Sequence, residues 1–298
     1  MDEDRLKNII KKLLILTTTS LPLDVVNGLK RICKGSDKVL KLVCDLMLEN
    51  LDYAHRGSIP LCQDTGIPIF YVDLGAKSPF KELIVRNIDH IVKNVVRELT
   101  LKGFLRPNVI DPLTRKNTGD NVGVNIPWIE LSMSKDSSDV LITLYLATGG
   151  SNLLGRALTY PILRGIDGLI DLIINTLADL GYNACPPLVV GIGLGPTAEI
   201  AIKLARKALL RPIGSRNKDP RIASLESKLF TEINRLGIGI QGLGQGPTLL
   251  DLHVEYASTH VAILSVGIMV SCWALRRSIL EISPEGKAYV ISHGVELS

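Results

Sequence analysis

Apolar side chains recur three or four positions apart along much of the first hundred residues, which is the spacing of amphipathic helices. The first stripe consists of Leu6, Ile9, Ile10, Leu13 and Leu14 and predicts a helix over residues 3–17. A second stripe covers residues 39–47, and the longest runs from Leu83 to Leu99, which predicts a helix of about five turns. The N-terminal third is therefore expected to be mostly helical.

Shorter apolar runs bounded by Gly, Pro or Asp predict strands interleaved with further helices. The interleaving predicts an α/β fold with mixed sheets flanked by helices and a helix-rich N-terminal third, in a single domain of residues 1–298. The predicted strands are residues 67–74, 140–146 and 188–192, with two more between His253 and Val270. The predicted later helices are residues 161–180, 197–211 and 221–236.

Composition limits the classes of protein that fit this pattern. The net charge of +4, from 34 basic and 30 acidic residues, is a small excess and does not indicate nucleic-acid binding. The longest uncharged apolar stretch, Val261–Leu275, is too short to span a membrane, and the acidic start Met1–Asp4 argues against a secretory signal. We expect a cytoplasmic protein whose five cysteines, lacking paired spacing, are free thiols in a reducing compartment.

Three of the cysteines lie in segments rich in turn formers. Cys62 lies within Pro60–Pro68, Cys185 precedes two prolines, and Cys272 lies between Ser271 and Trp273. Their separations are too long for a zinc finger or a CxxC pair, so only the fold could bring them together. A convergent set of three thiols would suit an iron–sulfur cluster with one iron not bound by the protein. Spacing alone favours the alternative of scattered core thiols.

Glycine-rich runs mark three further segments. Gly191–Thr197 follows a predicted strand and opens a helix, but its spacing departs from GxGxxG and is weak evidence for nucleotide binding. Gly237–Thr248 is either a flexible connection or ordered backbone packed close to a neighbour, and its alternating apolar residues favour order. Thr148–Asn152 ends a predicted strand, where ligand-binding loops commonly lie.

Two acid–base candidates have both a chemical and a structural interpretation. Asp64 could transfer a proton beside Cys62, yet Asp before Thr-Gly is also an ordinary turn residue. His253 and His260 flank a carboxylate, Glu255, and could bind a metal or act in catalysis. For His253 the structural interpretation is favoured, and for His260 the residues alone decide nothing.

Taken together, these segments resemble the N-terminal domain, or separately encoded α subunit, of the class I fumarase and L-tartrate dehydratase family of oxygen-sensitive hydro-lyases. The resemblance extends from about residue 5 to residue 280, and the order of the motifs is that of the family. The segments that carry it are Leu61–Gly66, Asn117–Asn121, Gly149–Ser151, Cys185–Pro187, Gly191–Ala198, Gly239–Gly246, Asp251–Tyr256 and Cys272–Trp273.

The resemblance implies a [4Fe-4S] cluster held by Cys62, Cys185 and Cys272. In this family the cluster serves as a Lewis acid rather than as an electron carrier. Cys33 and Cys44 match no motif of the family and are expected to be buried helix thiols.

The same resemblance assigns the substrate-binding and catalytic groups. Gln63 and Asp64 would contact the substrate beside the cluster, with Asp64 a candidate proton shuttle. Arg106 would clamp a substrate carboxylate, a task that suits a guanidinium fork. The backbone of Gly149 and Gly150 would donate to the same ligand, and His260 would be a carboxylate partner or an acid–base group.

Single-chain members of the family continue into a second domain that contributes further substrate-binding residues. This chain is therefore expected to act with a separately encoded β subunit, in an α2β2 heterotetramer without nucleic acid or membrane. The implied reaction is the reversible hydration of fumarate to L-malate, and L-tartrate dehydration is the alternative that uses the same residues.

Two interpretations from other classes stay open. The residues Ala147, Thr148 and Pro196 depart from the family pattern, which motivates a non-catalytic iron–sulfur scaffold or regulatory subunit. Retention of Gln63, Asp64, Arg106 and His260 argues against that interpretation. A nicotinamide-dependent dehydrogenase is a more distant alternative, resting on the glycine run alone.

Overall fold

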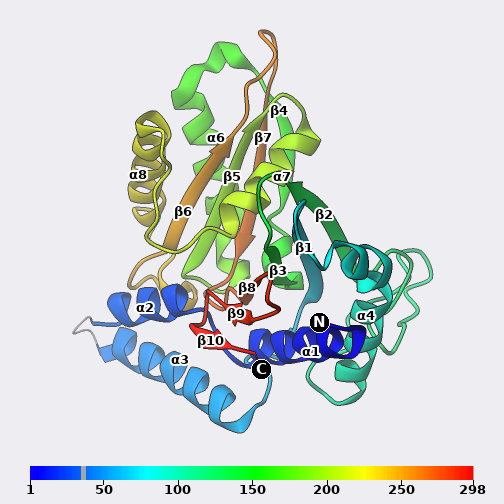
Figure 1. Ribbon diagram of the computed structural model, residues 1–298. Coiled ribbons are helices and arrows are strands. Elements are labelled where there is room, and N and C mark those ends of the chain that lie inside the picture. The colour runs from blue at the N-terminus through cyan, green and yellow to red at the C-terminus, as the bar shows by residue number, and fades with distance from the viewer. Residues whose placement is uncertain (35–37, 298) are drawn as a thin grey trace. The chain divides into compact units, whose positions relative to one another are not determined.

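The computed structural model describes residues 1–34 and 38–297 of the chain (Figure 1). The chain divides into two compact units, each assembled from segments far apart in sequence. The first unit comprises Met1–Leu23, Glu49–Thr148 and Arg276–Ser298, and the second comprises Asp24–Leu48 and Gly149–Leu275. Each unit contains a mixed sheet and helices, which confirms the predicted α/β class. The assignment of residues 1–298 to one domain stays a prediction.

The first unit is built on a six-stranded sheet in the order β10-β9-β8-β3-β1-β2. β1 pairs with β2 in parallel and with β3 antiparallel, so β2 lies at one edge of the sheet. The strands are β1 (Ile67–Gly75), β2 (Trp128–Ser134), β3 (Val140–Ala147), β8 (Arg277–Ile282), β9 (Ala288–Val290) and β10 (Val295–Glu296).

The core of the first unit lies between this sheet and two helices, α1 (Glu3–Thr19) and α4 (Lys81–Leu101). Every second residue of β1 enters the core, namely Phe70, Val72 and Leu74, because successive side chains of a strand point to opposite faces. The buried apolar residues of α1 are the predicted stripe, and Asp2 begins the helix by accepting a hydrogen bond from the Arg5 N–H. Both helices are confirmed, each extending about two residues beyond the predicted range.

The second unit is built on a four-stranded sheet in the order β4-β7-β5-β6, in which β5 and β6 are parallel and the other pairs antiparallel. The strands are β4 (Arg156–Tyr160), β5 (Leu188–Gly195), β6 (Leu249–Tyr256) and β7 (Leu264–Ser271). The long helices of this unit are α2 (Leu23–Ile32), α6 (Gly165–Leu180), α7 (Ala198–Leu209) and α8 (Pro220–Asn234). Helix α3 (Lys38–Gly57) belongs to it as far as Leu48 and to the first unit from Glu49. The short ones are α5 (Gly149–Asn152), η1 (Ile162–Arg164), η2 (Gly181–Ala184) and η3 (Ile240–Gly242).

Helix α7 lies unusually close to the middle of this sheet. A β-carbon built on Gly191 would lie 2.1 Å from the Ala205 carbonyl oxygen, and one on Gly193 would lie 1.9 Å from that of Ala201. The alternate residues of β5, Val190 and Ile192, belong to the core that includes α6 and α8, so α7 covers the opposite face. The glycines thus lie inside β5, which runs to Gly195 rather than ending at residue 192 as predicted, and they admit a helix rather than a nucleotide.

One expectation about the cysteines is wrong. Cys33, just after α2, and Cys44, in α3, form a disulfide whose Cα atoms lie 5.5 Å apart, so these two residues are not free thiols. The hairpin of α2 and α3 brings the two positions within the range that a disulfide spans. Cys62, Cys185 and Cys272 take no part in a disulfide.

Over the described residues, no helix combines the length and the apolar character needed to cross a bilayer.

Candidate functional site

In the first unit, the loop of Cys62, Gln63 and Asp64 connects α3 to β1. Cys62 and Gln63 are exposed and Asp64 is half-buried. Gly66 has a φ of +78°, and a β-carbon there would lie 3.0 Å from the backbone of Ala147, so only glycine suits this turn. The Gly66 N–H donates to Asp64 Oδ1 at 3.1 Å. Asp64 therefore stabilises the turn with one carboxylate oxygen, as its structural interpretation expected, on a loop that presents Cys62 and Gln63 to solvent.

Arg106 lies against this loop with its backbone fixed and its side chain exposed. Its N–H donates to Thr65 Oγ1 at 2.9 Å, and its carbonyl accepts a hydrogen bond from Asn121 Nδ2 at 2.8 Å. Over the described residues the guanidinium makes no hydrogen bond or ion pair, which leaves its five N–H donors available to an anion. The structure thus brings Arg106 and the Cys62–Asp64 loop together, through Thr65.

Asn121 organises the Arg106 segment from inside the protein. It is fully buried with a φ of +59°, and its side-chain oxygen accepts from the N–H groups of Asn108 (2.7 Å) and Val109 (3.1 Å). Its side-chain nitrogen donates to Thr100 Oγ1 at 3.0 Å, in addition to the carbonyl of Arg106. The sequence singled out the Asn117–Asn121 motif without a role, and this hydrogen bonding gives it one.

Arg276 is a further residue of this region that sequence reasoning did not assign. It is 1% exposed, and its Nη2 donates to the Asp64 carbonyl oxygen at 2.6 Å. Its own carbonyl accepts from Leu146 N–H at 3.1 Å, so Arg276 joins the Asp64 loop to the end of β3. Its Nε and Nη1 are buried without a hydrogen-bond partner among the described residues.

In the second unit, Cys185 and Cys272 lie at the same end of the four-stranded sheet. Cys185 precedes β5 and Cys272 follows β7, and these strands are antiparallel, with Val189 opposite Ser271. The Trp273 N–H donates to the Cys185 carbonyl oxygen at 3.3 Å. The Cys185 residue is exposed and Cys272 is half-buried. Two of the three predicted cluster ligands are therefore neighbours.

Gly149 and Gly150 lie beside Cys185 in this unit. They open α5, which packs against β7 and η2, and η2 ends at the residue before Cys185. A β-carbon on Gly150 would meet only the Asn183 carbonyl oxygen, at 3.8 Å. Both glycines are exposed, so their backbone is accessible to a ligand.

His260 lies away from Cys185 and Cys272. It lies in the segment between β6 and β7, at the end of the sheet opposite Cys185, and the eight residues of β5 separate the two ends by about 25 Å. It is exposed, and its Nδ1 accepts from the Ala262 N–H at 3.2 Å.

His253, in contrast, is a buried structural residue. It is 0% exposed, and its Nε2 lies 3.1 Å from Asp251 Oδ2. Burial raises the pKa of Asp251, but hydrogen bonds and charge from His253, with two backbone N–H groups, outweigh it and lower that pKa to about 2. The carboxylate therefore stays ionised inside the second unit, as the structural interpretation of His253 expected.

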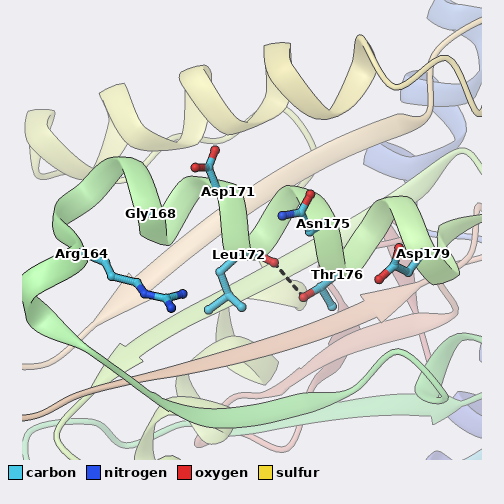
Figure 2. Close-up of a pocket in the computed structure, with 7 residues that line it drawn as sticks. All are labelled: Arg164, Gly168, Asp171, Leu172, Asn175, Thr176 and Asp179. Atoms are coloured by element: carbon cyan, nitrogen blue, oxygen red, sulfur yellow. Dashed lines mark hydrogen bonds between the residues drawn. The ribbon is translucent and has the colours of Figure 1, made fainter.

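Surface hollows in each unit lie apart from the predicted residues. The one along α6 has a volume of about 700 Å³. Figure 2 shows residues that line it, among them Arg164, just before α6, and Asp171 and Asp179 of α6, together with the hydrogen bond from the Thr176 hydroxyl to the Leu172 carbonyl. A second, of about 600 Å³, is enclosed by residues 109–126 and includes Asn117 and Thr118. Neither contains a cysteine.

The chain was compared with known families and proteins. The family model described as "Fumarate hydratase (Fumerase)" matches residues 7–281. The chain belongs to this family.

Similar members have a length close to that of this chain. The "Putative L(+)-tartrate dehydratase subunit alpha" of Methanocaldococcus jannaschii is 40% identical over 286 residues, which is 95% of this chain and 99% of that protein. The L(+)-tartrate dehydratase subunits alpha of Escherichia coli K12 and Shigella sonnei are each 34% identical over 291 residues, 97% of this chain and 95% of theirs. The chain therefore covers nearly the full length of these α subunits.

Proposed function

We propose that this chain is the cluster-bearing α subunit of a cytoplasmic hydro-lyase that interconverts L-malate and fumarate. In this proposal it acts with a separately encoded β subunit, as an α2β2 heterotetramer, and binds a [4Fe-4S] cluster through Cys62, Cys185 and Cys272. The observation that carries the proposal is that Cys185 and Cys272 lie at the same end of one sheet, in a chain of the fumarate hydratase family.

The donor set fits an iron–sulfur cluster. Thiolates are the ligands such clusters prefer, and the three thiols in question are the ones that the disulfide leaves available. Among the described residues, no three or more His, Cys, Asp or Glu side chains are gathered where they could hold a metal ion, so the fit rests on the chemistry of the thiols.

When bound, a cluster with three protein ligands supplies a Lewis-acidic iron that polarises the substrate hydroxyl. The chain's own residues bind and orient the dicarboxylate. Arg106 pairs with one carboxylate through its exposed guanidinium, which is aimed by a backbone fixed at both its N–H and its carbonyl. Gln63 and the Gly149 and Gly150 backbone provide neutral donors, which add orientation without charge.

Asp64 is the proposed acid–base residue of this chain. Its backbone carbonyl is held by Arg276 and one carboxylate oxygen by the Gly66 N–H, so the group is fixed in place beside Gln63. A carboxyl group held in this way can give a proton to the departing hydroxyl in the dehydration direction and take one from the adding water in the hydration direction. His260 lies at the other end of its own sheet and is left out of the site that one copy of this chain forms.

The test of cluster binding is iron and acid-labile sulfide after anaerobic reconstitution. The wild-type chain should bind about four of each. The variants Cys62→Ser, Cys185→Ser and Cys272→Ser should each lose most of both, and a variant with Cys33→Ser and Cys44→Ser should bind as wild type does. Equal binding by all four variants would remove the ligand assignment, and little iron in the wild type would favour the non-catalytic scaffold.

L-tartrate dehydration is the second candidate, because the relatives reported above are named as L(+)-tartrate dehydratase α subunits. The two substrates differ by one hydroxyl group, which a site built to hydrogen-bond it can discriminate strongly. The reconstituted complex with its β subunit should be assayed with L-malate, following fumarate, and with L(+)-tartrate, following oxaloacetate. The larger kcat/KM identifies the substrate.

A further inference from the structure

Cys185 is held in an unusual backbone conformation at the start of β5. Its φ is +52°, in the left-handed region that residues other than glycine seldom adopt. Such a conformation persists only where neighbouring groups hold it. The carbonyl oxygens of Cys185 and of the next residue, Pro186, are both engaged, and the two partners come from different segments.

Gln241 holds the Pro186 carbonyl with two donors. Its main-chain N–H lies 2.9 Å from Pro186 O, and its side-chain Nε2 lies 3.0 Å from the same oxygen. A carbonyl oxygen accepts two hydrogen bonds, so this one is saturated by a single residue. Gln241 itself has a φ of +53°, which aims both donors at one point.

The glycine-rich run that contains Gln241 is held in one conformation by its own backbone hydrogen bonds. Ile240 N–H donates to Gln245 O at 2.7 Å, and Gly244 N–H donates to Ile238 O at 2.9 Å. A β-carbon on Gly239 would lie 2.3 Å from the Gln245 nitrogen, so the loop closes tightly on itself. This order confirms that the run is packed backbone and not a flexible connection.

The glycine-rich run is also hydrogen-bonded to the four-stranded sheet. The Gly239 N–H donates to Thr248 Oγ1 at 3.3 Å, and the Thr248 carbonyl accepts from the Leu188 N–H, the first residue of β5, at 2.8 Å. Gln241 and Cys185 are thus both fixed relative to the start of strands β5 and β6. Any displacement of Gln241 would be transmitted to Pro186 and, through one peptide bond, to Cys185.

We propose that Gln241 is a positioning residue for the Cys185 thiol. It acts through the Pro186 carbonyl and is itself supported by the glycine-rich run Gly237–Thr248. The inference rests on the proposed function for its significance, since a fixed thiol matters most as a cluster ligand. Groups that orient metal ligands typically change metal affinity by about 10–100-fold when they are removed.

Two substitutions remove the side-chain donor in different ways. Gln241→Glu keeps the shape and replaces the donor by an acceptor, and Gln241→Asn keeps a neutral amide that is too short to reach Pro186. Asparagine also tolerates positive φ, which separates the lost hydrogen bond from backbone strain. The matched control is Asn175→Asp, the same amide-to-carboxylate change on the exposed side of α6.

The first readout is iron release to a chelator from the reconstituted complex under anaerobic conditions. Both Gln241 variants should release iron about tenfold faster than wild type, and Asn175→Asp should not differ from wild type. The second readout needs no cluster. In the reduced, cluster-free protein, iodoacetamide labelling followed by peptide mass analysis should show a changed rate for Cys185 and an unchanged rate for Cys62. Thermal unfolding verifies that each variant is folded.

The outcomes separate the two proposals. A wild-type complex that binds no cluster defeats the proposed function, while the labelling rate of Cys185 still decides whether Gln241 fixes that thiol. A wild type that binds the cluster, with variants matching it in iron release and Cys185 labelling, overturns the role of Gln241. If Gln241→Glu does not fold, Gln241→Asn provides the same comparison.

Discussion

The main-chain N–H of Arg106 donates a 2.9 Å hydrogen bond to the hydroxyl oxygen of Thr65. The two residues are 41 positions apart, and Thr65 adjoins Asp64 in the loop that carries Cys62. The same hydroxyl lies 3.4 Å from Asn108 Nδ2. Through this one buried oxygen, the proposed carboxylate-binding residue is fixed relative to the loop that presents Cys62, Gln63 and Asp64.

Replacing Thr65 by Val should weaken substrate binding more than folding. The methyl group removes the acceptor of the Arg106 N–H while keeping the volume, so Arg106 loses its alignment. We expect kcat/KM for the dicarboxylate to fall about tenfold, the equivalent of one hydrogen bond of about 1.4 kcal/mol. Steady-state kinetics of the α–β complex measures this change. Thr65→Ser retains the hydroxyl and should stay near wild type; a serine variant as impaired as the valine one would contradict this role.

Replacing Asn121 by Ala should destabilise the first unit as well as impair activity. The change removes four hydrogen bonds inside the protein and places alanine at a φ of +59°. A loss of about 3 kcal/mol in the free energy of unfolding is expected, because buried donors and acceptors remain unpaired. Urea unfolding measures it. Asn117→Ala is the control: this side chain is exposed, donates to the Pro107 carbonyl and accepts from the Gly119 N–H, and its loss should cost less than about 1 kcal/mol.

Replacing Gly193 by Ala should destabilise the second unit strongly. The new β-carbon would lie 1.9 Å from the Ala201 carbonyl oxygen, so α7 and β5 have to separate. We expect a loss of about 3 kcal/mol or more in the free energy of unfolding. Gly57→Ala meets only Ile59 side-chain atoms at 3.6 Å or beyond and should change stability by no more than about 0.5 kcal/mol. A Gly193→Ala protein as stable as wild type would show that α7 is not seated as described.

Glu98 should add to stability only above acid pH. Hydrogen bonds from Lys102, at 2.6 Å, and from Lys11 lower the pKa of Glu98 from 4.5 to about 2. A carboxylate with a lowered pKa in the folded state stabilises the protein above pH 4.5 and loses that effect as the pH falls towards 2. The side chain is 29% exposed, so Glu98→Gln should cost about 1 kcal/mol at pH 7, and the difference from wild type should vanish near pH 2.

The comparison for Glu98 is a pair on the same helix. Glu82 and Arg86 are about 73% and 72% exposed, and Glu82→Gln should leave the stability nearly unchanged. Thermal unfolding between pH 3 and pH 7, at low and high salt, measures both variants. A Glu98→Gln deficit that persists unchanged at pH 3 would mean that the ion pairs are not its source.

Removing the Cys33–Cys44 disulfide should lower stability without affecting metal binding. The bond closes a loop of 11 residues, and loss of a loop of this size is worth about 2–3 kcal/mol. The variant with Cys33→Ser and Cys44→Ser should therefore unfold at lower denaturant concentration and still bind iron and sulfide as wild type does. Reduced wild-type protein should match this variant in stability. Loss of iron with the disulfide would instead implicate these cysteines in the cluster site.

The helices and central strands were predictable because each buries one continuous apolar face. The stripe from Leu83 to Leu99 is buried along one face of α4, and β3 is a run of apolar residues interrupted only by Thr143. The missed strands lack that signal. β2 is an edge strand with Trp128 and Met133 exposed, and β8 begins with the buried polar residues Arg277 and Ser278. Burial of arginine follows from tertiary structure that no local pattern records.

The candidate site divides in the same way. The cysteines, Gln63 and Arg106 were identified from the segments in which they lie, since turn formers and family motifs are local. Thr65, Asn121 and Gln241 also lie in segments that carry the resemblance, but their roles were not identified, because each acts through a backbone atom distant in sequence; Gln241 and Pro186 are 55 residues apart. Hydrogen bonds to a carbonyl leave no trace in the residue that accepts them, so such partners become visible only in the folded chain.

The contact between α7 and the glycines of β5 has a consequence for how related sequences diverge. At Gly191 and Gly193 every side chain is excluded by an oxygen atom of the helix backbone, whatever reaction the protein catalyses. These positions should therefore stay invariant across relatives with different substrates, and they should tolerate fewer replacements than Arg106, whose side chain faces solvent. An invariant glycine in this family would then indicate a position where a helix packs against the sheet, just as an invariant polar residue indicates a catalytic or binding role.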